Sequence, residues 1–425
     1  MMSKYHGPDV GESALRHAPV FIGAILLLLG ASAPAATISW TNVNGGDWSV
    51  AANWNPNQVP GAADDVLITA DGNYTVRLDI SANISSLAVG GGSGTQTLTN
   101  PASPLNIANS GVVNANGVLG LGGGTLNGTN QVSGTMNWTA GILGGPLTVA
   151  NGGLLNILGT SSLYLYAPLT NAGTINWSNA ATLFLYNNHT PAYSGAIYNL
   201  AGGLFNLRTD QYLYGYLGQE FVNNAGTVQK LGGTGTSTFY GVPLTNSGTV
   251  SAQQGTLSFQ SGFVQGSSAT LASVLGGAAP GSGYGQIQFA NPLMLAGTFA
   301  ASTRNGFRPS LTDTFYVLTY PSSTGIFASL TGLDLGGGLW LQPNFSSTGL
   351  TLSVTTKSPS SRPQLVITHS GTNVLIQWPL GFPTWVLQST TNLTSSLWAV
   401  VPGVFTNQAL VPISGPEQCF RLISN

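Results

Sequence analysis

The sequence is poor in charged residues. Only 22 of its 425 residues are Lys, Arg, Asp or Glu (10 basic and 12 acidic), which is 5% of the chain, whereas an ordinary soluble domain is about 25% charged. This shortage excludes coiled coils, which need Glu, Lys and Arg along their helices, and disordered chains of high charge. A net charge of −2 also excludes the basic surface with which proteins attract nucleic acid. Few acid–base groups are left for an enzyme.

Cysteine is almost absent as well. The single cysteine, Cys419, cannot form an internal disulfide, so the fold must be held by burial and hydrogen bonds. Glycine and proline are abundant, with 58 and 23 residues, but glycine does not recur at every third position, which excludes a collagen helix. The composition indicates a folded, nearly neutral chain that is rich in turns.

The N-terminus has the composition of an export signal. Lys4 and Arg16 precede an apolar run at residues 20–29, and small residues follow at 30–36. A positive segment, a short apolar segment and an Ala-x-Ala exit predict a cleaved signal peptide over residues 1–36. A membrane anchor is the alternative, but the run is shorter than the about 20 residues that span a bilayer. We therefore expect a secreted or cell-surface chain without a transmembrane segment after cleavage.

Short phrases recur in the middle of the chain, where residues 81–207 contain no charged residue. The phrase at 171–177 (NAGTINW) is echoed at 224–230 and 246–252. Each phrase joins an Asn-x-Gly turn to residues that favour strands, and a strand and turn that recur after about 20 residues are typical of solenoid repeats. Equivalent residues of stacked strands lie about 4.8 Å apart. Like charges would repel at that spacing, whereas Asn, Ser and Thr can hydrogen-bond.

These patterns predict an all-β protein with a parallel β-solenoid (β-helix) over residues 81–266. An antiparallel sandwich or a propeller is the alternative, because the spacing between related phrases is irregular. Residues 37–80, rich in Trp and Asp, are predicted to form an N-terminal cap that shields the open end of the solenoid. Residues 267–356 are predicted to form a C-terminal all-β cap region. A linker at 357–363 precedes a small β-sandwich, of the size of a fibronectin type III module, at 364–425.

An alternation of leucine with aromatic residues predicts a candidate binding surface at residues 163–166, 183–186 and 212–216. A period of two places the leucines on one face of a strand and the aromatic rings on the other. With the leucines in the core, the exposed rings would be Tyr164, Tyr166, Phe184, Tyr186, Tyr212 and Tyr214. Exposed rings suit the apolar faces of sugars, which predicts glycan binding. The alternative is that the rings pack under a loop or against the next domain.

Two carboxylates suggest an alternative, enzymatic function. Asp210 and Glu220 are the only acids between Ser81 and Asp313, and glycoside hydrolysis normally needs two carboxyl groups about 5–10 Å apart. They flank an aromatic segment, which raises the possibility of a carbohydrate-active β-helix enzyme, a polysaccharide lyase or hydrolase. The other interpretation is that both are solvated ends of a coil. We favour a non-enzymatic protein of structural or adhesive function.

Adjacent aspartates raise the question of a metal. Asp64 and Asp65 can bind Ca²⁺ together with backbone carbonyls, but the sequence has no Asp-x-Asp-x-Asp-Gly loop. Such aspartates more often accept backbone N–H bonds in turns. We therefore expect no metal and no cofactor, with calcium at these two residues as the alternative. The expected partners are extracellular polysaccharide or other surface proteins, and not nucleic acid.

Three stretches of the chain carry distinctive motifs. The first comprises residues 46–56, 60–61 and 64–66; the second 224–230, 255–259, 306–309 and 325–330; the third 387–393, Trp398 and 420–422. In these motifs the chain resembles secreted repeat proteins of planctomycetes and verrucomicrobia that are described as autotransporter-like or adhesin-like. The resemblance spans most of the chain beyond the signal peptide, and it implies a surface β-solenoid.

Overall fold

The computed structural model describes residues 36–178, 181–356, 363–379, 385–394, 397–404, 407–415 and 417–424. The predicted signal peptide, apart from residue 36, and the predicted linker, apart from residue 363, lie outside these residues. The described chain is all-β, as predicted, with one short 3-10 helix, η1 (Ala51–Asn53). In the described part of the chain, no helix has the length and hydropathy needed to cross a membrane.

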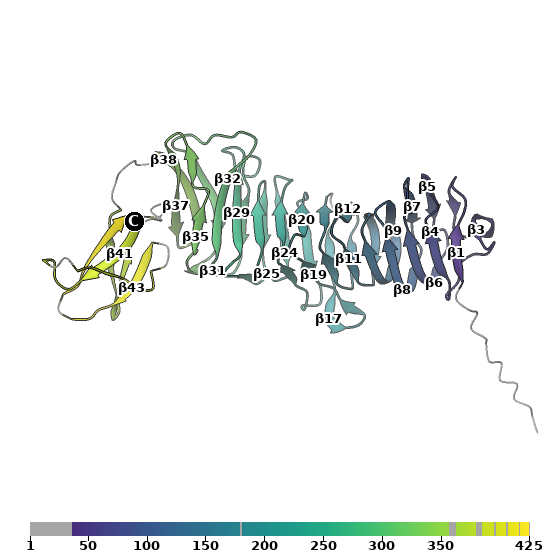
Figure 1. Cartoon of the computed structure of the whole chain (residues 1–425), viewed down its shortest axis with the longest axis horizontal. Coiled ribbons are helices and arrows are strands. Elements are labelled where there is room, and N and C mark those ends of the chain that lie inside the picture. Colours follow the sequence, from purple (N-terminus) through teal and green to yellow (C-terminus); the bar gives the residue numbers. More distant parts are fainter. Residues whose placement is uncertain are drawn as a thin grey trace, which may run out of the picture. The chain divides into compact units, whose positions relative to one another are not determined.

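Most strands belong to one continuous 34-stranded sheet, whose parallel pairings form three faces of a solenoid (Figure 1). This parallel pairing excludes the sandwich and propeller alternatives for the repeats. Each regular coil contributes one strand to the second face, then one to the third and one to the first. Some long strands, such as β9 (Gly117–Val132), turn a corner and serve more than one face.

The first face contains β1 (Thr37–Trp40), β4 (Asp65–Ile68), parts of β6 (Ala82–Val89), β8 (Leu105–Val113) and β9, then β11 (Leu147–Val149), β14 (Leu169–Asn171), β19 (Ile197–Asn199), β22 (Val222–Asn224), β25 (Leu244–Asn246) and β28 (Phe263–Gln265). A separate parallel pair follows, β31 (Leu293–Leu295) with β34 (Ser323–Gly325).

The second face contains β2 (Gly46–Asp47), β5 (Tyr74–Arg77), β7 (Gln96–Asn100), the start of β9, β10 (Thr135–Leu143), β12 (Leu154–Ile157), β15 (Thr174–Trp177), β20 (Leu204–Leu207), β23 (Thr227–Lys230), β26 (Thr249–Ala252), β29 (Thr270–Leu275), β32 (Thr298–Thr303) and β35 (Ser329–Thr331). The parallel pairing therefore crosses the boundaries that the sequence predicts at 80/81 and 266/267.

The third face carries the candidate site. It contains the first halves of β6 and β8, the later parts of β9 and β10, then β13 (Leu163–Leu165), β16 (Leu183–Leu185), β21 (Tyr212–Gly215), β24 (Thr236–Tyr240), β27 (Thr256–Phe259), β30 (Gln286–Phe289) and β33 (Thr314–Thr319). A hairpin of β17 (Asn187–Thr190) and β18 (Tyr193–Ser194) is inserted after β16.

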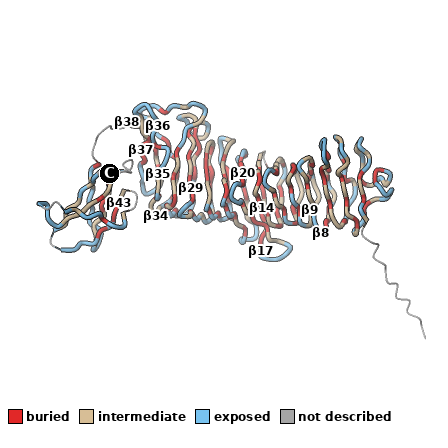
Figure 2. Tube along the Cα trace, in the orientation of Figure 1, coloured by how far each residue is buried: buried red, intermediate tan, exposed pale blue. Residues whose placement is uncertain are grey.

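The core lies inside the three faces. Along most strands buried and partly exposed residues alternate, as the tube coloured by burial shows (Figure 2). One continuous hydrophobic cluster extends from Ile38 to Val354. Because a fully buried aliphatic side chain contributes about 1.5–3 kcal/mol, this cluster supplies the main driving force for stacking the coils.

Antiparallel strands follow the parallel stack at both ends of the solenoid. At the first coil, β3 (Trp54–Asn55) pairs antiparallel with β1, and Trp54 packs edge-on against Trp40 and Trp48 with ring centroids 4.8 Å apart in each pair. At the last coil, β38 (Gly349–Thr356) pairs antiparallel with β33 and with β37 (Leu339–Ser346), which pairs with β36 (Asp334–Gly336). These antiparallel strands occupy the edge of the first face at β1 and the edge of the third face at β33, where another strand could otherwise add.

A separate module follows the solenoid in sequence. It has two three-stranded antiparallel sheets: β39 (Val366–Ser370), β40 (Asn373–Gln377) and β43 (Gln408–Pro412); and β42 (Ala399–Val400), β41 (Trp385–Thr390) and β44 (Cys419–Ser424). Residues of both sheets form its own core: Ile376, Trp378, Leu387, Val401, Ala409 and Val411.

Candidate functional site

The leucine–aromatic alternation lies on the third face, in β13, β16 and β21. Leu163, Leu183 and Leu213 are in register and fully buried, so the leucines face the core, which is the condition on which the exposed rings were predicted. The aromatic residues between them point to the outer side of the face, because successive side chains of a strand alternate between its two sides.

The outer rings form two columns. In the first column, ring centroids of Tyr164 and Phe184 are 5.7 Å apart, those of Phe184 and Tyr214 5.3 Å, and those of Tyr214 and Tyr240 5.1 Å. In the second, Tyr186 lies 4.9 Å from Tyr166 and 4.6 Å from Tyr216. We call these seven rings the aromatic platform: Tyr164, Tyr166, Phe184, Tyr186, Tyr214, Tyr216 and Tyr240.

The platform differs in three members from the set predicted by sequence: Tyr212 is absent from it, and Tyr216 and Tyr240 are added. Tyr214 is in register with Phe184, and Tyr216 donates its backbone N–H to Leu185, so these two residues continue the columns. Tyr212 lies two residues before Tyr214 on the same strand, and it is in register with Thr238 rather than with an aromatic residue. The same spacing of two residues that links Tyr164 to Tyr166 could have identified Tyr216. Tyr240 had no such signal, because Thr238 takes the place of an aromatic residue before it.

Exposure varies across the platform. Tyr216 and Tyr240 are 59% and 48% exposed, whereas the other five rings are partly buried. Burial, followed by the neighbouring tyrosines, raises the pKa of both Tyr166 and Tyr186 above the ordinary value of 10.0. Their hydroxyls therefore stay protonated near neutral pH and can both donate and accept hydrogen bonds.

The β17–β18 hairpin borders the platform at the corner between the third and first faces. Its Tyr193 packs edge-on against Tyr166, with centroids 4.9 Å apart, and lies 5.8 Å from Tyr186. Part of the second column is therefore covered by a loop, as the alternative interpretation of the rings had it. Tyr216 and Tyr240 nevertheless remain largely exposed.

Glu220 fixes the base of this hairpin. The residue is only 1% exposed, and its carboxylate accepts the backbone N–H groups of Asn187 (2.8 Å), Leu217 (2.7 Å) and Gly218 (2.7 Å). These three bonds join the start of the hairpin to residues 217–218 through one carboxylate. Glu220 is therefore a buried organiser of the corner, and the interpretation of this residue as a solvated end of a coil is wrong.

Asp210 is bonded to a different set of groups. Its Oδ1 accepts a hydrogen bond from Lys230 Nζ (2.7 Å), and its Oδ2 accepts one from the Gly235 N–H (3.0 Å). The Lys230 side chain is fully buried, and burial lowers its pKa below 10.5 although Asp210 opposes that shift. The hydrogen bonds of Asp210 and Glu220 thus go to separate groups, and the structure gives each carboxylate its own structural role.

The two adjacent aspartates of the first coils are also engaged. Asp64 Oδ2 accepts the Gly61 N–H (2.8 Å) and closes a turn. The Ser86 hydroxyl donates to Asp65 across neighbouring coils and holds the pKa of that carboxyl below 3.8. Among the described residues, no group of three or more His, Cys, Asp or Glu side chains is placed to hold a metal ion. Asp64 therefore fits the turn interpretation, and Asp65 connects two coils.

Side-chain amides run along the solenoid, as expected for a charge-free stack. An inner ladder on the first face joins Asn171, Asn199, Asn224, Asn246 and Gln265 through bonds of 2.7–2.9 Å. An outer ladder on the second face joins Asn137, Asn156, Asn176, Asn206 and Gln229. A third joins Asn83, Asn106 and Asn127 on the outer side of the third face. Each ladder ties coils together without charge.

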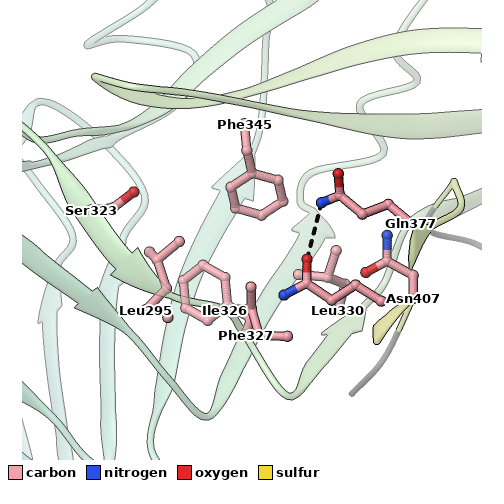
Figure 3. A pocket seen from close by; sticks show the side chains of 10 residues that line it. Leu295, Ser323, Ile326, Phe327, Leu330, Phe345, Gln377 and Asn407 are labelled. Carbon is pink, nitrogen blue, oxygen red and sulfur yellow. Dashed lines mark hydrogen bonds between the residues drawn. The ribbon is translucent and has the colours of Figure 1, made fainter. Parts of the chain in front are cut away.

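A pocket of about 210 Å³ is lined by apolar residues and amides (Figure 3). Leu295, Phe327 and Phe345 line one part of it, and Gln377 Nε2 donates to Gln408 Oε1 at 3.0 Å. Its lining contains no acidic or basic side chain, so it offers no general acid or base.

Comparison with models of known protein families and with curated proteins gives no match.

Proposed function

We propose that this protein is a secreted or cell-surface β-solenoid of structural or adhesive function that binds neutral glycans through the aromatic platform. The observation that carries the proposal is the group of seven neighbouring aromatic rings, in two columns, on the outer side of the third face. An outward apolar patch on a soluble protein usually marks a contact site.

The chemistry of the platform suits sugars. The C–H faces of a pyranose pack on aromatic rings, and the tyrosine hydroxyls bond the equatorial hydroxyl groups at the edge of the sugar. The strands beneath the rings are held by parallel pairing and a buried leucine layer. Because the platform is already ordered, binding costs little conformational entropy.

Export is the second part of the proposal. It rests on the charged, apolar and small segments of residues 1–36 and on the resemblance to secreted repeat proteins. A low-charge solenoid with amide ladders between its coils suits a role as an extracellular spacer or adhesin.

The test is a glycan array, followed by calorimetric titration of the neutral glycans retained, with the exported chain. Tyr216→Ala and Tyr240→Ala should each weaken binding by roughly tenfold, which corresponds to about 1.4 kcal/mol. Tyr316→Ala is the matched control, because Tyr316 is also 59% exposed but lies in β33, away from the platform. Binding that is unchanged in both platform variants would refute the proposal.

The same samples distinguish the enzymatic alternative. We expect no turnover of the polysaccharides that bind. Turnover that is abolished by Asp210→Asn or Glu220→Gln, in chains that still fold, would show that the protein is a polysaccharide lyase or hydrolase rather than a binding protein.

A further inference from the structure

The outer side of the third face is continuous from the first coils to the platform. Asn83, Asn106 and Asn127 occupy the same position on successive coils. The next coil places Gly144 there, because Leu143 is in register with Leu126. The following coil places Tyr166 there, because Leu165 is in register with Leu143.

Backbone hydrogen bonds confirm this register. Gly144 donates to the carbonyl of Leu126, and Tyr166 donates to that of Leu143. Tyr186 and Tyr216 continue the series by donating to Leu165 and Leu185. One line along the solenoid therefore contains Asn83, Asn106, Asn127, Gly144, Tyr166, Tyr186 and Tyr216.

The amides on this line keep free bonding capacity. Asn106 Nδ2 donates to Asn83 Oδ1 (2.8 Å), and Asn127 Nδ2 donates to Asn106 Oδ1 (2.6 Å). The ladder uses one N–H and one lone pair of Asn106, whereas an amide has two N–H groups and two lone pairs. Asn83 is exposed and the other two are partly exposed, so the remaining groups can meet a ligand.

Gly144 makes room for the end of the amide ladder. A Cβ atom at this position would lie 2.1 Å from Asn127 Oδ1, so any larger residue would displace the end of the amide ladder. The Asn127 amide occupies the space beside Gly144 that a side chain would otherwise fill.

We propose that this line is a track for one extended, neutral polysaccharide chain that lies along the solenoid axis. The inference rests on the proposed function. Sugar rings stack on the platform where Tyr193 leaves it uncovered, and sugar hydroxyls further along the chain bond the amides of Asn83, Asn106 and Asn127. Six coil spacings of about 4.8 Å give the track a length of about 29 Å, which is far longer than a disaccharide.

The absence of charge in this stretch argues for a neutral occupant. Residues 81–207, which supply all but the last member of the track, contain no Lys, Arg, Asp or Glu. A polymer of uronic acids would therefore lose hydration of its carboxylates without gaining a cation from these coils.

The experiment measures the affinity of the exported chain for cello-, xylo- and manno-oligosaccharides, from disaccharide to hexasaccharide, with oligogalacturonate as the charged comparison. Affinity for at least one neutral series should continue to rise beyond the trisaccharide. Tyr216→Ala should weaken binding at every length, whereas Asn83→Ala and Asn106→Ala should weaken only the longer members, by several-fold. Asn83 ends the ladder and is exposed, so its variant keeps the test valid even where Asn106→Ala destabilises the fold.

Asn156→Ala is the matched control, because Asn156 belongs to an outer ladder on the second face. An affinity that stops rising at the disaccharide, or hexasaccharide binding that neither asparagine variant reduces, would overturn the track and leave the platform in place. Tighter binding of oligogalacturonate than of every neutral series would also overturn it. Wild-type binding by both Tyr216→Ala and Tyr240→Ala would instead refute the proposed function itself.

Discussion

Lys230 Nζ lies 2.7 Å from Asp210 Oδ1, with the lysine side chain fully buried and the aspartate side chain 37% exposed. Lys230 occupies the inward position that Leu207 holds in the preceding coil. Its ammonium group also donates to the carbonyls of Thr209 and Gly232 and to the Ser237 hydroxyl. A single charge is thus accommodated in the stack because four acceptors surround it.

Asp210→Asn should destabilise the chain by about 1–3 kcal/mol, because a buried ammonium group loses its only anionic acceptor among these four. Urea unfolding followed by circular dichroism measures the change. Asp71→Asn is the control, since exposed Asp71 accepts one N–H bond from Ser93 and should cost much less. Equal stability of the two variants would contradict a structural role for the Lys230–Asp210 pair.

Glu220→Gln should loosen the β17–β18 hairpin. The amide cannot accept from Asn187, Leu217 and Gly218 as the carboxylate does, and hydrogen bonds to a charged group contribute about 1.5–3 kcal/mol each. Hydrogen exchange should show faster exchange of the Asn187 amide and of residues 217–218 than in the wild type. Unchanged exchange at these amides would show that Glu220 does not hold the corner.

Asn224→Ala should be more destabilising than Asn156→Ala, although each removes two ladder bonds. Asn224 bonds Asn199 and Asn246 inside the solenoid at 2.7 and 2.8 Å, where an unsatisfied polar group costs about 1–3 kcal/mol. Asn156 bonds Asn137 and Asn176 on the outer side, where water can replace it. Thermal and urea unfolding of the two variants measure how much stability each loses. A similar loss of stability in both would contradict the argument from burial.

Acid should weaken the first coils through Asp79. Burial raises the pKa of this carboxyl, but hydrogen bonds from the Ser49 hydroxyl and N–H outweigh it and hold the pKa below 3.8. Between the folded-state pKa and pH 3.8, the unfolded chain binds more protons at Asp79 than the folded chain does. The contribution of Asp79 to stability is therefore complete above this window and is lost as the pH falls through the folded-state pKa.

The measurement for Asp79 compares the free energy of unfolding of the wild type and Asp79→Asn from neutral pH to strong acid. The difference between the two should shrink as the pH falls. A difference that stays constant over this range would show that Asp79 does not contribute through its charge.

Local patterns in the sequence were sufficient for the fold class. Asn-x-Gly turns followed by Thr, Val and Ile predict short strands, and the absence of charge over residues 81–207 predicts columns of like residues. The alternation of Leu163 and Leu165 with tyrosines predicted which side of the third face is buried. These properties depend on neighbours one or two positions apart in the chain, which is why they can be read without a structure.

Only the tertiary structure decided which residues share a column. Successive members of the track lie 23, 21, 17, 22, 20 and 30 positions apart, because corners differ in length and the β17–β18 hairpin lengthens one coil. Contacts across the stack depend on this register, and so does the engagement of Glu220 with Asn187, 33 positions earlier. The sequence therefore determined that this chain is a charge-poor stack of β coils, whereas the packing of unequal coils decided where its amides and rings form one line.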